Sequence, residues 1–264
     1  MVNVAKNEKK FDGRKLNITY ANNYSGRNSF EEFRNAIRRY GVKVTLSKII
    51  RFSIPIFPVY LYHKLIDKTF IAEERHFKYC LRLNRFVNSE RIVEVPIVME
   101  KIIHNSSKKC LEVGDTINNY YSFPHDVVDK YEMRNSVINL DIVDFNPKEK
   151  YDTIFSISTV EHIGFDETEK NPGKAILAIN KMLSLLANHG SLIITVPLGY
   201  NPEIDNLILN NSFNFHILFL ERYSKFNKWR DTSKDIALQK KYNSRYPNAN
   251  SIAVIYYSNG ASNE

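Results

Sequence analysis

Acidic, small and imidazole side chains follow two short apolar runs in this sequence. The first run closes with Glu112 and Gly114, and the second, over residues 151–157, is followed by Glu161 and His162. Such runs are typical of buried parallel strands, whose carboxyl ends form the edge where open α/β sheets bind ligands. The sequence therefore predicts one site at this edge, with titratable groups beside it.

Two of these residues suit particular tasks. An imidazole titrates near neutral pH, so His162 is our candidate for a base that accepts the proton of a nucleophile. Glycine has no Cβ, so Gly114 would let the backbone pass close to a ligand. The structural alternative is that Glu161 and His162 order the loop after their strand.

Five segments of the chain follow one another in an informative order. They are a strand with a glycine turn, a second strand with an acidic end, a short polar and apolar segment, a fourth strand with its loop, and a helix before a fifth strand. Their residues are 110–114, 126–129, 139–142, 151–164 and 183–197, the last with a helix stop expected at Gly190. This order resembles the class I S-adenosylmethionine-dependent methyltransferases over about residues 91–257.

The resemblance implies a Rossmann-like α/β fold that binds S-adenosylmethionine as its cofactor. In that family the positions of Glu112 and Gly114 support the methionine part of the cofactor, and the position of Asp129 binds the ribose hydroxyls. A carboxylate can accept from two hydroxyls at once. The alternatives are that Glu112 ties down neighbouring backbone amides and that Asp129 caps the next turn.

The same resemblance assigns the adenine and methyl-transfer sides of the site. Asp141 would face the exocyclic amine of adenine and Ile142 would pack on its ring. Ser156 would line the methionine pocket. In this family Glu161 and His162 either supply the catalytic base or contact the methionine end of the cofactor.

The first loop has only Gly114, because Asp115 and the three residues after it include no second glycine. A glycine-poor subgroup of uncharacterised bacterial and archaeal methyltransferase-like proteins shares this loop, and the chain looks like one of them. Such proteins are associated with making or modifying surface polysaccharides. We therefore expect a small-molecule or glycan acceptor.

Length and composition are those of a globular protein with one catalytic domain and an extension. The 264 residues are 43% hydrophobic, and the two cysteines are too few for a disulfide framework. The first 20 residues lack the apolar centre of a secretory signal, so a cytoplasmic protein is expected. No Cys/His spacing of a metal site is present.

Positive charge is concentrated in the N-terminal part. Residues 1–110 hold 22 Lys and Arg against 10 Asp and Glu, within a formal net charge of +8 for the chain. This asymmetry indicates either an anionic partner or a solvated basic face. No RNA-binding module accompanies the charge, so nucleic acid is not the expected partner.

The chain divides into three expected regions. Residues 1–27 are a disordered or loosely attached arm, residues 28–104 a basic helical extension, and residues 105–264 the catalytic domain. The apolar stretch 49–62 is too short and too interrupted by proline to span a bilayer. It packs as a strap on the catalytic domain, or residues 48–68 contact a membrane from its inner face.

Secondary structure completes the expected fold. We predict a helix over residues 83–104, a short helix over 203–209, and two strands over 213–223 and 251–257. With the five segments above, this gives a seven-stranded, mostly parallel sheet in the order 3-2-1-4-5-7-6. The function that follows is methyl transfer to an oxygen or nitrogen, and the alternative is a non-catalytic binding module that uses the basic N-terminal region.

Overall fold

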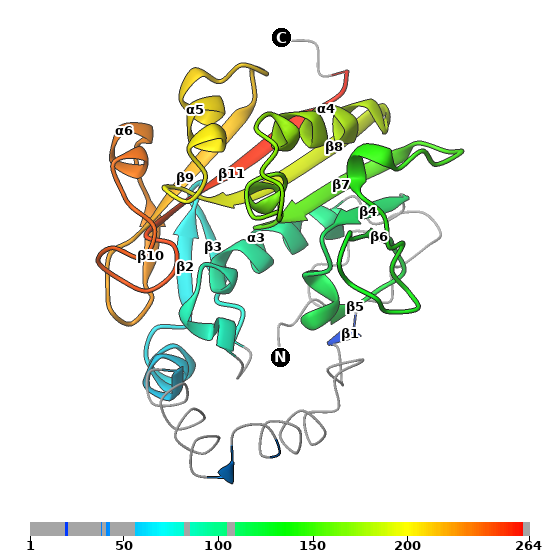
Figure 1. Cartoon of the computed structure of the whole chain (residues 1–264). Coiled ribbons are helices and arrows are strands. Elements are labelled where there is room, and N and C mark those ends of the chain that lie inside the picture. The colour runs from blue at the N-terminus through cyan, green and yellow to red at the C-terminus, as the bar shows by residue number, and fades with distance from the viewer. Residues whose placement is uncertain are drawn as a thin grey trace.

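A central mixed sheet organises the chain in the computed structural model, which describes residues 19–20, 38, 41–42, 56–81, 85–104 and 109–260. The sheet has seven strands in the order β10-β9-β11-β8-β7-β4-β6 (Figure 1). In chain order these strands are β4 (Cys110–Val113), β6 (Asp126–Val128), β7 (Tyr151–Ile157), β8 (Leu186–Pro197), β9 (His216–Arg222), β10 (Trp229–Asp231) and β11 (Ser251–Ser258).

The strand directions confirm the predicted Rossmann-like fold class. Strand β4 pairs in parallel with β6 and β7, and β7 pairs in parallel with β8. Strand β11 is antiparallel to both β8 and β9, as expected for the hairpin that closes such a sheet. The six strands from β6 to β9 thus follow the predicted order 2-1-4-5-7-6.

The predicted third strand is wrong. Its segment makes a single parallel bridge, Val128 to Ile138, and the seventh strand of the sheet is β10, at the opposite edge. The Asn139 side chain donates to the carbonyl oxygens of three loop residues. The shortest of these bonds, at 2.8 Å, joins Nδ2 of Asn139 to the carbonyl oxygen of Lys130. Asp141 caps the 3-10 helix η4 (Ile142–Asp144). These side chains satisfy the backbone of a loop, and so the segment does not extend the ladder.

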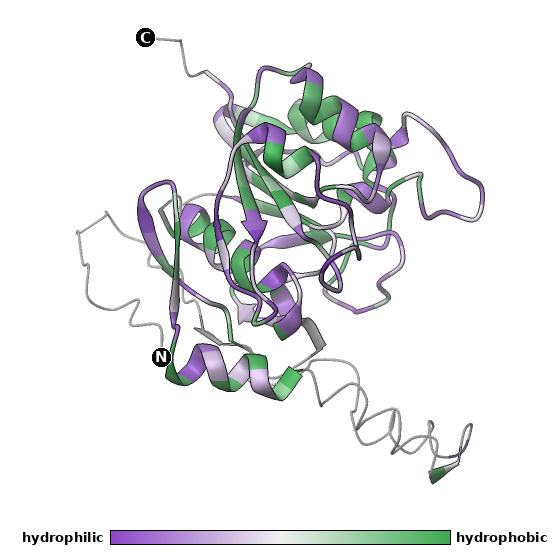
Figure 2. Cartoon of the chain, turned by 90° about the vertical axis from the view of Figure 1, so that its left-hand side faces the viewer, coloured by the Kyte–Doolittle hydropathy of each residue, from purple (hydrophilic) through white to green (hydrophobic). Residues whose placement is uncertain are grey.

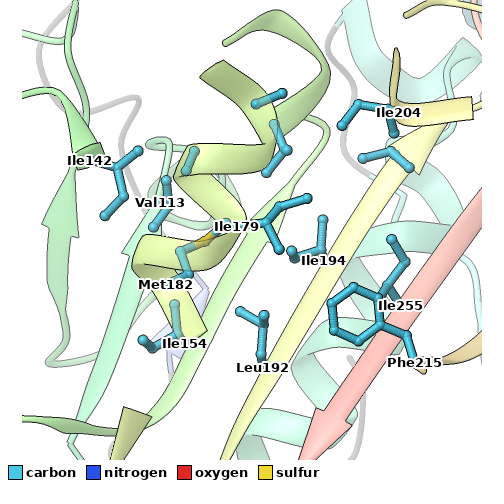
Figure 3. Packing of buried hydrophobic residues seen from close by; sticks show 14 of the residues in the cluster. Val113, Ile142, Ile154, Ile179, Met182, Leu192, Ile194, Ile204, Phe215 and Ile255 are labelled. Carbon is cyan, nitrogen blue, oxygen red and sulfur yellow. The ribbon is translucent and has the colours of Figure 1, made fainter. Parts of the chain in front are cut away.

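Helices cover both faces of the sheet. One face packs against α3 (Arg91–His104), and the other against α4 (Lys174–Ser184), α5 (Pro202–Asn210) and α6 (Lys234–Leu238), as Figure 1 shows for α3, α4 and α5. Successive side chains of β7 point to opposite faces of the sheet. Ile154 therefore belongs to the core under α4 and Phe155 to the core under α3. Figure 3 shows the first of these cores, and Figure 2 shows hydrophobic residues gathered on the central strands.

Two helix boundaries differ from the prediction. The helix expected over residues 83–104 begins as a 3-10 turn, η2 (Arg85–Asn88), before α3. The helix stop expected at Gly190 is wrong, because α4 ends at Ser184 and Gly190 lies inside β8. A Cβ on Gly190 would lie 3.1 Å from the Tyr151 carbonyl, where the pairing of β7 with β8 shifts register. This glycine therefore permits a strand irregularity.

The N-terminal region is described in part. Residues 56–65 are helical and lead into a hairpin of β2 (Thr69–Ala72) and β3 (Arg75–Lys78). Strand β1 (Thr19–Tyr20) pairs with β5 (Tyr121–Ser122), and the rest of the predicted arm lies outside the described residues, as does most of the predicted extension before residue 56. No helix among the described residues has the length and apolar character needed to cross a membrane.

Candidate functional site

The carboxyl ends of β4, β6 and β7 meet at the point where the sheet changes winding direction. From β4 the chain passes to β6 on one side and afterwards to β7 on the other. Open α/β sheets bind ligands at such a switch point. The residues that follow these three strands are therefore the candidate site, as the sequence predicted.

Gly114 follows β4 in a left-handed conformation, with φ of +89°. A Cβ at this position would lie 2.2 Å from Oγ1 of Thr159, which is impossible without rearrangement. The close neighbour is thus a side chain of the protein itself. Glycine at position 114 is required by the packing of Thr159, and a contact with cofactor stays a prediction.

Glu112 is fully buried and organises the glycine-poor loop. Its Oε1 accepts from the backbone amides of Thr116 and Ile117 at 2.8 and 2.7 Å, and its Oε2 lies 2.9 Å from Nε2 of His125. Burial raises the pKa of Glu112 despite these bonds. Burial would lower the pKa of His125, but the bond to Glu112 outweighs it and the pKa is raised. The carboxylate of Glu112 thus fixes the loop after β4, whose single glycine is Gly114.

Asp129 follows β6 and is held by three backbone amides. Its Oδ1 accepts from Tyr131 at 2.8 Å and Glu132 at 2.9 Å, and its Oδ2 accepts from Asp115 at 3.2 Å. A carboxylate has about four acceptor positions, so Oδ2 retains one. Asp129 therefore caps the next turn and can still accept from one further donor.

The two predicted adenine residues have different surroundings. Asp141 Oδ2 lies 2.7 Å from Nζ of Lys174 and 3.2 Å from Nζ of Lys130, while Oδ1 accepts from the Val143 amide. Burial would raise the pKa of Asp141, but the lysines and the amide lower it. The Ile142 side chain is buried in the core under α4 (Figure 3).

Two serines of the β7 end also bond within the chain. Ser156 is fully buried and donates to the Val113 carbonyl at 2.9 Å, which ties β7 to β4. Ser158 donates to Oε1 of Glu94 at 2.7 Å. Ser156 thus has a structural contact where the resemblance implied a place in the methionine pocket, and that place stays a prediction.

Arg91, at the start of α3, inserts its guanidinium between the ends of β4 and β7. Nη1 donates to the Ile157 carbonyl and to Oγ1 of Thr116, and Nη2 donates to the Ser158 carbonyl at 3.1 Å. The side chain is only 15% exposed. The residue is therefore part of the switch point.

Glu161 and His162 lie together in η5 (Val160–His162), directly after β7. Glu161 is 1% exposed, and neither of its carboxylate oxygens makes a hydrogen bond of normal geometry within the described part of the chain. His162 is half-exposed, with Nε2 at 3.6 Å from Oε1 of Glu161. Burial raises the pKa of Glu161 well above its usual range.

Asp166 orients the imidazole of His162. Its Oδ2 lies 2.5 Å from Nδ1 of His162 and accepts from the Tyr200 hydroxyl at 2.6 Å. Burial would raise the pKa of Asp166, but these two bonds lower it. The sequence carried a signal for this pair, because residues four apart in a helical turn face one another, but that signal does not distinguish it from a surface contact.

Glu94 is one of the site residues that sequence reasoning missed. It lies in α3, is 0% exposed, and has its Oε2 3.9 Å from Nε of Arg91. Burial raises its pKa to about 7. A glutamate in a helix gives no sign in the sequence that it faces the core.

No group of three or more His, Cys, Asp and Glu side chains in the described ranges could hold a metal ion.

Comparisons with known proteins give similarities of structure alone. No protein-family model and no curated protein matches the chain. The N-methyltransferase NodS from Bradyrhizobium japonicum WM9, in complex with S-adenosyl-L-homocysteine, is 12% identical with a TM-score of 0.42, covering 67% of this chain and 91% of its own.

Two further solved structures are similar at the same level. The 1,6-didemethyltoxoflavin-N1-methyltransferase of Burkholderia thailandensis is 10% identical, with a TM-score of 0.39 over 63% of this chain and 78% of its own. The sugar N-methyltransferase KedS8 from Streptoalloteichus is 14% identical, with a TM-score of 0.33 over 51% and 56%. The assignment of the fold therefore depends on the strand order and directions of the chain itself.

Proposed function

We propose that the chain is an S-adenosylmethionine-dependent methyltransferase that methylates an oxygen or nitrogen of a small molecule, sugar or glycolipid. The observation that carries the proposal is the gathering of Gly114, Asp129 and Arg91 at the switch point of the sheet. A role in making surface polysaccharides would suit such an acceptor and belongs to the same proposal.

The residues at the switch point fit the chemistry of this cofactor. Asp129 has an acceptor position left for a ribose hydroxyl, and the permanent charge of Arg91 suits the cofactor's carboxylate. S-Adenosylmethionine, when bound, supplies a methyl group on a positively charged sulfur. The protein then has to hold a nucleophile in line and take up its proton, and our candidates for that task are Glu161 and His162, directly after β7.

Calorimetric titration with S-adenosylhomocysteine tests the proposal. Asp129→Asn keeps the oxygen that caps residues 131 and 132 but replaces the second oxygen with a donor, which would repel a hydroxyl proton. We expect the variant to bind about tenfold or more weakly. The matched control is Asp235→Asn, an exposed aspartate of α6, which should bind as the wild type does. Equal affinity in both variants would contradict the role of Asp129.

A non-catalytic module is the second candidate, and specific contacts favour it. Glu112, Asp129 and Asp141 already bond groups of the chain, and Thr159 packs on Gly114. Such a module would hold a partner through the basic N-terminal region. Absence of binding heat with both S-adenosylmethionine and S-adenosylhomocysteine would support it over the enzyme.

A further inference from the structure

Two buried glutamates beside the switch point have carboxylate oxygens that make no hydrogen bond of normal geometry among the described residues. Glu94 is 0% and Glu161 is 1% exposed. Three of their four carboxylate oxygens, Oε2 of Glu94 and both of Glu161, make no hydrogen bond of normal geometry within the described residues. Leaving such groups without donors is costly, and sites of this kind usually receive a ligand or carry a functional role.

Arg91 is the cation beside these carboxyls. It directs its terminal nitrogens to the carbonyls of Ile157 and Ser158, and its Nε lies 3.9 Å from Oε2 of Glu94. That separation is beyond a hydrogen bond. Glu90 adds a further buried carboxylate nearby, with its Oε2 accepting from the Ala249 amide at 3.2 Å. Three buried carboxyls, those of Glu90, Glu94 and Glu161, therefore share one guanidinium.

The pair lies beside the carboxyl end of β7. Glu94 is joined through Ser158 to the carboxyl end of β7, and Glu161 follows in the next turn. Arg91 and Glu94 are among the charged groups that act most strongly on Glu161. Both carboxyls thus lie on the β7 side of the switch point.

We propose that Glu94 and Glu161 bind the protonated amine of the methyl acceptor, so that the acceptor is an amine and not an alcohol. This inference depends on the proposed methyltransferase function and specifies its substrate class. An ammonium group has three N–H donors, and the pair has three oxygens without hydrogen bonds. A single hydroxyl would leave at least two of these oxygens without a donor.

The pair also provides the proton transfer that an amine acceptor requires. An ammonium nitrogen has no free electron pair, so it must lose one proton before it can form a bond to carbon. The carboxylate of Glu161 takes that proton, which leaves a neutral amine and a neutral carboxyl group. Burial raises the pKa of Glu161 and makes it a stronger proton acceptor than an exposed glutamate.

A half-exposed imidazole lies beside the pair. Nε2 of His162 is 3.6 Å from Oε1 of Glu161, and the imidazole is 47% exposed. Asp166 fixes the ring through Nδ1. The titratable and charged groups that face the two carboxyls are Glu90, Arg91, His162, Tyr200 and Tyr242.

Sinefungin tests the inference without knowledge of the acceptor. This analogue has a C–NH₃⁺ group where the cofactor has S⁺–CH₃, whereas S-adenosylhomocysteine has no charge there. Calorimetry should show that the wild type prefers sinefungin by about tenfold or more. In Glu161→Gln and Glu94→Gln the preference should fall to about twofold or less. The affinity for S-adenosylhomocysteine should be retained, as in the control Glu169→Gln, which changes an exposed glutamate.

Each outcome has one interpretation. Failure of the wild type to bind either compound overturns the proposed function. Binding of both compounds with equal affinity overturns the inference about the amine and leaves the methyltransferase intact. If the variants do not fold, wild-type titrations in two buffers of different ionisation enthalpy decide the question. Sinefungin should release more protons than S-adenosylhomocysteine as the carboxyls ionise, and equal release would overturn the inference.

Discussion

At the scale of single residues, Gly114 is a position where a small change has a large expected effect. Gly114→Ala places a Cβ 2.2 Å from Thr159 Oγ1 and forces alanine to a φ of +89°, so we expect a loss of about 3 kcal/mol in the free energy of unfolding. The matched control is Gly173→Ala. Its φ is +84°, but the added Cβ would have no neighbour nearer than Oε1 of Glu203 at 3.9 Å, so backbone strain alone predicts a loss of about 1 kcal/mol in the free energy of unfolding. Urea unfolding measures both, and equal losses would show that the Thr159 contact contributes nothing.

Sequence reasoning located the edge residues but not all of their partners. Glu112, Gly114, Asp129 and Glu161 lie near the strand ends as predicted, because a strand's carboxyl end can be read from the apolar run before it. The burial of Glu94 could not be read in this way, since it depends on how α3 packs across the sheet. The order of the five segments was enough to predict the fold class. The individual hydrogen bonds depend on tertiary contacts, which the sequence does not show.

At the scale of elements, the membrane contact predicted for residues 48–68 concerns the helical residues 56–65. Leu65 and Ile66 are 68% and 73% exposed, between the exposed Lys64 and Lys68. Apolar side chains flanked by lysines suit the surface of an anionic bilayer. We therefore propose peripheral contact with the inner face of a membrane through this element, which was predicted from the sequence as part of residues 48–68.

Sedimentation with anionic vesicles tests that element. The full-length protein should pellet with vesicles that contain phosphatidylserine, and Lys64→Glu with Lys68→Glu should reduce the bound fraction several-fold, since each basic residue contributes about 1 kcal/mol near such a surface. Charge reversal at Lys148 and Lys241, two exposed lysines elsewhere, serves as the control for net charge. Equal binding by both double variants would remove this element from membrane contact.

At the scale of the whole molecule, the buried carboxyls should make stability depend on pH. Burial raises the pKa of Glu94 from 4.5 to about 7, so the folded state binds more protons than the unfolded state between these values. The free energy of unfolding should therefore fall as pH rises through this window, by roughly 3 kcal/mol for Glu94 alone. Glu161, whose pKa is also raised, changes the free energy of unfolding in the same direction. The positive charge of Arg91 lowers the pKa of both glutamates and so reduces the effect.

Urea unfolding at a series of pH values measures this dependence. Glu94→Gln removes the titrating group but keeps an oxygen to accept from Ser158, so its unfolding free energy should be flatter between pH 5 and 7 than that of the wild type. Glu169→Gln, at an exposed position, should keep the wild-type slope. An unchanged slope in Glu94→Gln would mean that its carboxyl titrates as an exposed one does.

The central claim is that this fold binds the methyl-donor cofactor despite its single-glycine loop. Thermal unfolding with increasing S-adenosylhomocysteine tests it most directly, because a ligand bound only by the folded state stabilises that state by mass action, by about 2.7 kcal/mol at a hundred times its dissociation constant. We predict a melting temperature that rises continuously with ligand concentration and rises less for Asp129→Asn. A melting temperature that stays constant up to millimolar ligand would contradict the account.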